Sequence, residues 1–166
     1  MTRCESFSAQ VNYNSKILIL GSMPGIKSLE KAEYYAHPQN RFWKVMAVLC
    51  ECPNMPELEY SDKIKVLLNN NFALWDTIKF CKREGSLDSD ILEEVPNDLV
   101  TLLNKFKNIK TICLNGNKSY SVFKKFFPEL FQNYKCIKLP STSPANARFR
   151  LEDLVKEWKN SIYQND

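Results

Sequence analysis

Four short apolar segments, each followed at once by a turn or a polar residue, constrain the fold of this chain most. They occupy residues 16–20, 72–75, 111–114 and 136–139. The first three are almost continuously apolar, which is typical of strands buried on both faces of a sheet. Amphipathic helical patterns alternate with them, at residues 42–49, 62–68, 99–106, 118–127 and 151–163. This alternation predicts an α/β fold with parallel strands and helices on both faces. The polar tract at 82–96 is expected to form a long surface connection with a short helix.

Size and composition predict one domain, residues 1–166, and set few limits on function. The net charge of +4 is compatible with a polyanionic partner without indicating one. The six cysteines form no Cys-x-x-Cys pair, so we expect no metal site. Free thiols and a polar amino terminus predict a cytoplasmic protein, and no apolar run approaches the ~20 residues of a membrane span.

Parallel strands bring the loops that follow them to one edge of the sheet, where open α/β sheets bind their ligands. The predicted edge contains residues 21–24, 75–77, 115–117 and 140–146, which are rich in hydroxyls, amides and small side chains. Neither a Gly-x-x-x-x-Gly-Lys nor a Gly-x-Gly-x-x-Gly motif is present, so nucleotide hydrolysis and dinucleotide binding are poorly supported. The only histidine is His37, which leaves no Cys–His pair or Ser–His–acid set at this edge.

Each prominent residue near this edge also has a plain structural interpretation. Of the adjacent Tyr34 and Tyr35, one is expected to pack in the core and the other to face a cleft. Asn40 precedes a predicted helix and could simply cap it. His37 is interpreted first as a hydrogen-bonded loop residue. Lys118 could belong to a solvated helix face.

Taken together, these segments resemble the uracil-DNA glycosylase superfamily. Residues 19–25 resemble its first motif, and residues 139–148 resemble its second. The closest resemblance is to the hypoxanthine-DNA glycosylase family, through Gly-Ser-Met-Pro-Gly at 21–25 and His-Pro-Gln-Asn at 37–40. A segment at 74–76, followed by Cys81 and residues 83–89, also matches, so the resemblance spans about residues 16–158.

The resemblance implies a three-layer αβα sandwich around a four-stranded parallel sheet. It further implies that a flipped, deaminated base is excised from double-stranded DNA without a metal or cofactor. Other branches of the superfamily carry Asp or Asn in the first motif where this chain has Met23. In the resembling family the catalytic amide is the asparagine of the His-Pro-x-Asn run, which is Asn40 here. The second motif lacks a histidine, so no imidazole from that loop assists the leaving base.

Roles for the individual residues follow from this resemblance and from the chemistry of base excision. Asn40 is expected to orient the attacking water, as the catalytic residue of a monofunctional, monomeric enzyme. The base is expected to contact Gly21, Ser22, Met23, Pro24, Tyr35 and Asp76. Asn115 and Asn146 are alternatives to Asp76 for reading the edge of the base. The DNA is expected to contact Ser141, Thr142, Ser143, Pro144, Asn146, Arg148 and Lys118.

Three other interpretations remain open from sequence. The first is a mismatch-specific uracil/thymine-DNA glycosylase, against which Met23 argues. The second is a non-catalytic module of the same fold that binds damaged DNA. The third is an unrelated α/β protein that binds a free nucleobase or nucleotide; it should lack the salt-sensitive binding to duplex DNA that the others show.

Overall fold

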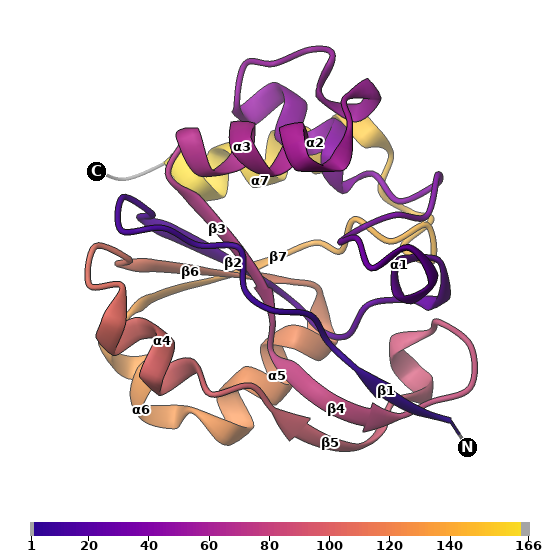
Figure 1. Ribbon diagram of the computed structural model, residues 1–166, viewed down its shortest axis with the longest axis vertical. Helices are drawn as coiled ribbons and strands as arrows, with labels where there is room; N and C mark the ends of the chain where they lie inside the picture. Colours follow the sequence, from indigo (N-terminus) through magenta and orange to yellow (C-terminus); the bar gives the residue numbers. More distant parts are fainter. Residues whose placement is uncertain (1, 164–166) are drawn as a thin grey trace.

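A four-stranded parallel sheet runs through the centre of the protein, in a computed structural model that describes residues 2–163 (Figure 1). Its strand order is β3–β2–β6–β7, and each predicted strand is confirmed to within one residue at either end. The ends of the predicted domain, residue 1 and residues 164–166, lie outside the described residues. The strands are β2 (Ile17–Gly21), β3 (Phe72–Asp76), β6 (Thr111–Asn115) and β7 (Lys135–Leu139).

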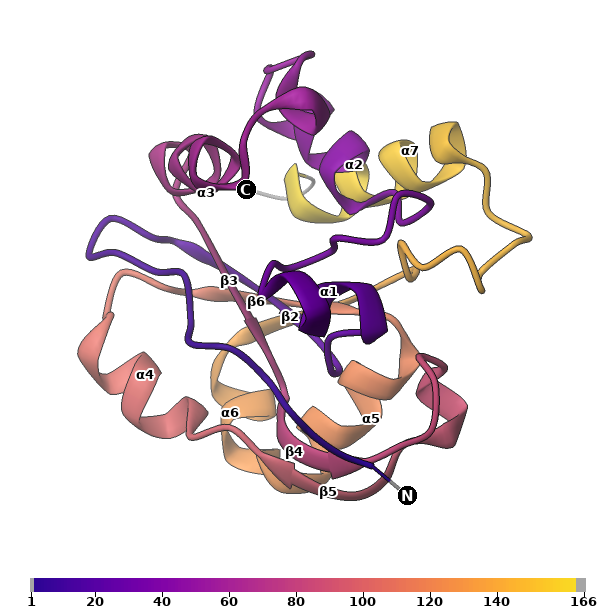
Figure 2. The same ribbon diagram turned by 45° about the vertical axis from the view of Figure 1, so that its right-hand side comes forward.

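Helices cover both faces of this sheet, which confirms the three-layer αβα architecture (Figures 1 and 2). One face carries α2 (Phe42–Leu49), α3 (Tyr60–Asn69) and α7 (Leu151–Tyr163). The other carries α4 (Leu99–Lys105), α5 (Asn117–Phe126) and α6 (Pro128–Asn133). Within residues 2–163, no helix combines the length and apolar character needed to cross a membrane.

The apolar strand segments are continuous because successive side chains enter two different cores. Ile19 packs toward α2 and α7, where Trp158 is fully buried. Its neighbours Leu18 and Leu20 pack toward α4 and α5 on the opposite face, in the core that contains Phe123. Since side chains alternate between the faces of a strand, a strand covered on both faces must be apolar at every position.

A second, antiparallel sheet lies beside the central one and was missed in the sequence. It contains β1 (Arg3–Glu5), β4 (Ile78–Lys82) and β5 (Leu92–Pro96), in the order β1–β4–β5. The expected surface connection at 82–96 is therefore wrong in part, although a short 3-10 helix, η2 (Asp88–Asp90), does lie within it. β5 is an edge strand with largely exposed or half-buried side chains, so its sequence lacks apolar alternation.

Three short helical elements were also not predicted. These are α1 (Ile26–Lys31), α6 and the 3-10 turn η1 (Met55–Glu57). None exceeds six residues, which is less than two turns and too short for an apolar period to emerge. α1 matters for the site because it follows directly from the 21–25 loop at the end of β2.

Candidate active site

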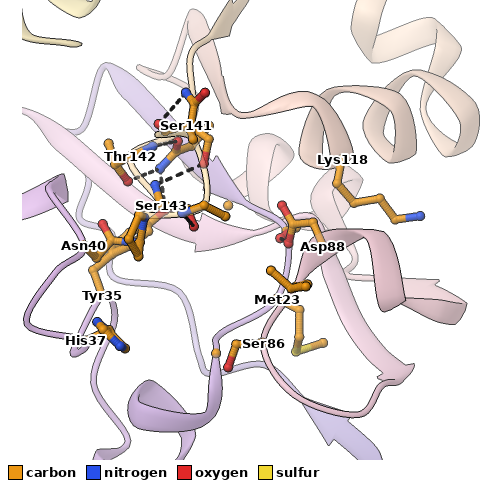
Figure 3. A pocket seen from close by; sticks show the side chains of 18 of the residues that line it. Met23, Tyr35, His37, Asn40, Ser86, Asp88, Lys118, Ser141, Thr142 and Ser143 are labelled. Carbon is orange, nitrogen blue, oxygen red and sulfur yellow. Dashed lines mark hydrogen bonds between the residues drawn. The ribbon is translucent and has the colours of Figure 1, made fainter. Parts of the chain in front are cut away.

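A pocket lies at the carboxyl edge of the central sheet. The register pairs Gly21 with Asp76 and Asn115 with Leu139, so the four strands end side by side. Loops 21–25, 34–40, 86–89, 115–118 and 139–149 contribute to its walls, and its volume is about 1210 Å³. Every residue assigned above to catalysis, base binding or DNA binding lines this pocket. Figure 3 shows Tyr35, His37 and Asn40 on one side, with Met23, Asp88 and Lys118 across from them.

Gly21 lines the pocket at a point where the surrounding side chains leave no room for a Cβ atom. A Cβ atom at this position would lie 2.7 Å from Asp76 Oδ1 and 2.9 Å from the Tyr35 hydroxyl. Both distances are shorter than real Cβ atoms show. Neither side chain can move away freely, because Asp76 is hydrogen-bonded to Ser6 and Tyr35 is hydrogen-bonded to Asn115. Only glycine therefore allows the Asp76 carboxyl and the Tyr35 hydroxyl to approach the end of β2 together.

Asp76 is a buried carboxyl group that titrates near neutral pH. Its side chain is 3% exposed, and the Ser6 hydroxyl donates a hydrogen bond of 2.7 Å to Oδ2. Burial raises the pKa of Asp76 to about 7, with a further contribution from Asp88, while the Ser6 hydrogen bond and the Arg83 charge oppose the rise. Ser6 was missed in the sequence because no local pattern links it to a strand end 70 residues away.

Tyr35 presents a fixed aromatic ring at the pocket. Its backbone is left-handed, with φ of 56°, and its ring stacks on Phe42 at a centroid distance of 4.0 Å. The hydroxyl accepts a hydrogen bond of 3.1 Å from Asn115 Nδ2. Burial and the nearby Asp76 raise the pKa of Tyr35 far above its ordinary value, so the hydroxyl stays protonated. Its neighbour Tyr34 is 2% exposed in the core, so the two tyrosines divide between core and cleft as predicted.

Asn40 has its side-chain amide fixed by the helix that follows it. Asn40 Oδ1 accepts the backbone N–H of Phe42, the first residue of α2, at 2.9 Å. The N-cap residue of α2 is Arg41, so Asn40 lies one position before the predicted cap, although its side chain does bind the first N–H group of the helix. An amide oxygen has two lone pairs, so Oδ1 can accept a second hydrogen bond from a water molecule. His37 is an exposed loop residue whose Nδ1 accepts the Gln39 N–H at 3.1 Å, as its plain interpretation predicts.

Asn115 ties the second-motif loop to the sheet. Its Oδ1 accepts the Thr142 N–H at 3.1 Å, and its Nδ2 donates to the Thr142 hydroxyl at 3.2 Å as well as to Tyr35. Asn146 Nδ2 donates to the Ser141 carbonyl at 3.0 Å. The polar atoms of Asn115 are thus all engaged within the protein, and this amide aligns the pocket wall. At the rim, Arg148 is exposed, and the Lys118 ammonium Nζ lies 3.8 Å from Glu94 Oε1.

Two residues of the 82–96 tract hold the first-motif loop and were not identified from sequence. Asp88 Oδ1 accepts a hydrogen bond of 2.6 Å from the Ser22 hydroxyl. Arg83 is 1% exposed, and its guanidinium donates to the carbonyls of Pro24 and Ser86. The polar cluster at 85–90 was the available signal, but its pairing with a loop more than 60 residues earlier could only be seen in three dimensions.

Comparison with known proteins agrees with this geometry. The family model of the uracil DNA glycosylase superfamily matches residues 8–164. A hypoxanthine DNA glycosylase of Methanosarcina acetivorans is 37% identical over 154 residues, which is 92% of this chain and 94% of that protein. One from Methanosarcina barkeri is 36% identical over 115 residues, covering 69% and 72% of the two chains. The solution NMR structure of a candidate uracil DNA glycosylase from M. acetivorans superposes with a TM-score of 0.79 at 34% identity, covering 98% of this chain and 100% of that one. The chain therefore belongs to the uracil DNA glycosylase superfamily.

Proposed function

We propose that this protein hydrolyses the N-glycosidic bond of a deaminated base in double-stranded DNA, with hypoxanthine as the principal substrate and uracil or xanthine as further ones. The product is an abasic site. The observation that carries the proposal is that Asn40, Tyr35 and the 21–25 loop line the same pocket. The two Methanosarcina relatives named as hypoxanthine DNA glycosylases support the choice of base.

A stacked base must leave the duplex before its glycosidic bond can be reached. Extrusion costs a few kcal/mol, least at a damaged or mispaired base. The ring of Tyr35 supports a stacking role for the flipped base, since Phe42 backs it on one side and the left-handed backbone holds it in place. Stacking of a base on an aromatic side chain contributes about 1–3 kcal/mol. Exposed Arg148 supplies positive charge at the rim for the phosphate backbone.

Hypoxanthine and uracil share a lactam edge, a carbonyl acceptor beside an N–H donor. Asp76 in its ionised form can accept the lactam N–H. Backbone N–H groups around Ser22 and Met23 can stabilise the charge that develops on the departing base. Adenine presents a bare ring nitrogen and an amino group instead, so an acceptor at Asp76 disfavours it.

Asn40 acts by position, because a carboxamide is not appreciably basic. The hydrogen bond from Phe42 N–H fixes Oδ1, whose remaining lone pair orients a water molecule toward the sugar. Such orientation is sufficient if the bond to the base breaks first and water attacks the cationic sugar late. The released base takes up a proton, and water supplies the new hydroxyl on the sugar. We expect a monofunctional enzyme, because the proposed nucleophile is this water molecule and not a lysine that would form a Schiff base.

The test is cleavage of end-labelled duplexes that hold one hypoxanthine, uracil or xanthine, followed by alkali. Asn40→Ala should lower excision of hypoxanthine by about 10²-fold, the cost of misplacing a reacting group, while duplex binding persists. Asp98→Ala is the matched control. It removes the hydrogen bond of 3.1 Å that the Thr101 N–H donates to Asp98 Oδ1 at the start of α4, outside the pocket. Each variant loses one hydrogen bond to a backbone N–H group at the start of a helix, so a similar small loss of stability is expected in both.

Different outcomes separate the alternatives. Wild-type activity in Asn40→Ala would reduce Asn40 to a helix cap and move catalysis to another residue. Binding of the damaged duplex with no excision by the wild type would indicate a binding module. Cleavage restricted to mispaired uracil or thymine would favour the mismatch-specific branch.

A further inference from the structure

A single guanidinium contacts four backbone carbonyls along the loop that connects β7 to α7. Arg41 Nη2 donates to the carbonyls of Ser143 at 2.7 Å and Asn146 at 3.2 Å, and Nη1 donates to that of Phe149. Nε lies 3.4 Å from the Thr142 carbonyl, which also accepts the backbone N–H of Arg41 at 3.1 Å. One side chain thus contacts four positions along the connection between β7 and α7.

Apart from the half-buried side chain of Phe149, which packs against the core, the distal part of this loop is held mainly by local contacts. Residues 140–150 contain no helix or strand, and Pro144, Ala145, Ala147 and Arg148 are exposed. Asn115 fixes the loop at Thr142, and short turn hydrogen bonds link Asn146 to Ser143 and Phe149 to Asn146. Between Thr142 and the start of α7, only Arg41 joins these carbonyls to another part of the described chain with side-chain hydrogen bonds.

The position of Arg41 links this contact to the candidate catalytic amide. Arg41 directly follows Asn40 and is the N-cap residue of α2, and it does not line the pocket itself. Its planar fork of five donors can serve several carbonyls at once, whereas a lysine ammonium with three donors has no such fixed geometry. The same turn of backbone therefore carries Asn40 on the pocket side and the loop anchor on the other.

We propose that Arg41 is a positioning residue that holds loop 140–150 in its DNA-engaging conformation beside Asn40. The proposal rests on the proposed function, since it assigns the loop to the DNA substrate. With Arg41 intact, the loop is ordered before DNA arrives, so its ordering does not oppose binding. Without Arg41, each DNA molecule has to order the distal loop as it binds.

Two substitutions distinguish the contribution of the planar guanidinium group from that of its positive charge. Arg41→Lys keeps a cation and most of the packing but loses the fork, and Arg41→Ala removes both. In single-turnover excision of hypoxanthine, each variant should raise the enzyme concentration for half-maximal rate by about 10- to 100-fold, the cost of a misplaced contact, with a smaller change in the maximal rate. Asn40→Ala should show the opposite split. Arg3→Ala, which removes an arginine that contacts Phe80 away from the pocket, is the matched control.

Loop order is read independently of activity by limited trypsin digestion. The cut after exposed Arg148, identified by mass spectrometry, should appear faster in both Arg41 variants than in wild type or Arg3→Ala. Affinity for a duplex carrying a stable abasic analogue should fall by a similar factor to the rise in half-maximal concentration. Guanidinium ion at millimolar concentration should restore part of the loss in Arg41→Ala, whereas sodium at the same ionic strength should not.

A purely structural role predicts a different pattern, which would overturn the proposal. The variants would then melt at lower temperature but, well below melting, keep wild-type half-maximal concentration, abasic-duplex affinity and cleavage at Arg148. Full activity in Arg41→Lys would also overturn it, since the fork would be unnecessary. If the wild type excised no base, the proposed function would fail, while the trypsin and abasic-duplex comparisons would still decide the role of Arg41.

Discussion

Replacing Asp76 by asparagine should stabilise the protein at alkaline pH and leave its stability almost unchanged at acid pH. The pKa of Asp76 rises from 3.8 to about 7 on folding, mainly through burial. Below pH 3.8 both folded and unfolded chains carry the proton, so the group has no effect. Between these values the folded protein binds a proton that the unfolded chain does not, so stability falls as pH rises. Above about pH 7 the ionised carboxyl exerts its full destabilising effect.

The expected magnitude follows from the two pKa values. Each pKa unit corresponds to about 1.4 kcal/mol, so ionised Asp76 lowers the free energy of unfolding by up to about 4 kcal/mol relative to the protonated form. Asparagine stays neutral, and its amide oxygen can still accept the Ser6 hydroxyl hydrogen bond. The stabilisation of Asp76→Asn over wild type should therefore grow steadily across this interval and level off above about pH 7.

Urea unfolding followed by tryptophan fluorescence, repeated between about pH 5 and pH 8.5, measures this difference. Asp98→Asn is a control of opposite sign, because hydrogen bonds from Thr101 lower the pKa of Asp98 and its carboxylate therefore stabilises the fold at neutral pH. Removing that carboxylate should destabilise. A stability gain in Asp76→Asn that is the same at every pH would refute the reasoning, since it would leave the carboxyl untitrated on folding.

Three further results are expected. Gly21→Ala should destabilise the protein by about 1–3 kcal/mol, because its Cβ displaces Asp76 or Tyr35, and excision should fall with it; a fully active, equally stable variant in thermal melting and nicking assays would contradict the close approach. Excision should rise as pH passes about 7 if Asp76 accepts the lactam N–H as a carboxylate, and Asp76→Asn should flatten this rise; a profile that falls with pH would assign Asp76 the donor role. Arg148→Ala should weaken binding to all duplexes alike and lower the salt slope by about one; a loss confined to one damaged base would argue against a phosphate contact.

The central sheet could be predicted from sequence because its chemistry is local. Strand segments such as 111–114 are apolar at consecutive positions, and each ends in a residue that marks a turn. The longer helices carried a clear apolar period and were located to within two residues at either end, and residues 42–49 and 151–163 were located to the residue. The edge strand β5 could not be found this way, because Glu93 and Glu94 replace the apolar alternation where one face meets solvent.

In the candidate site, too, the features set by local sequence were predictable and the long-range contacts were not. Strand-end loops brought Gly21, Asp76 and Asn115 together as expected, since parallel strands end at one edge. The contacts that set their chemistry were not predictable, because Ser6 and Arg41 reach partners 70 and 101 to 108 residues away through hydrogen bonds with no sequence pattern. Sequence thus located the pocket, and the structure was needed to find what fixes its pKa values and its walls.

The central claim is tested most directly by incubating the wild-type protein with a duplex that holds one hypoxanthine and analysing the products without alkali. We expect free hypoxanthine by mass spectrometry and an uncut strand with an abasic site. We also expect that borohydride traps no covalent adduct between protein and DNA. Intact hypoxanthine in the duplex, despite measurable binding, would contradict the assignment of excision. Strand cleavage with a trapped adduct would contradict the mechanism in which Asn40 orients water.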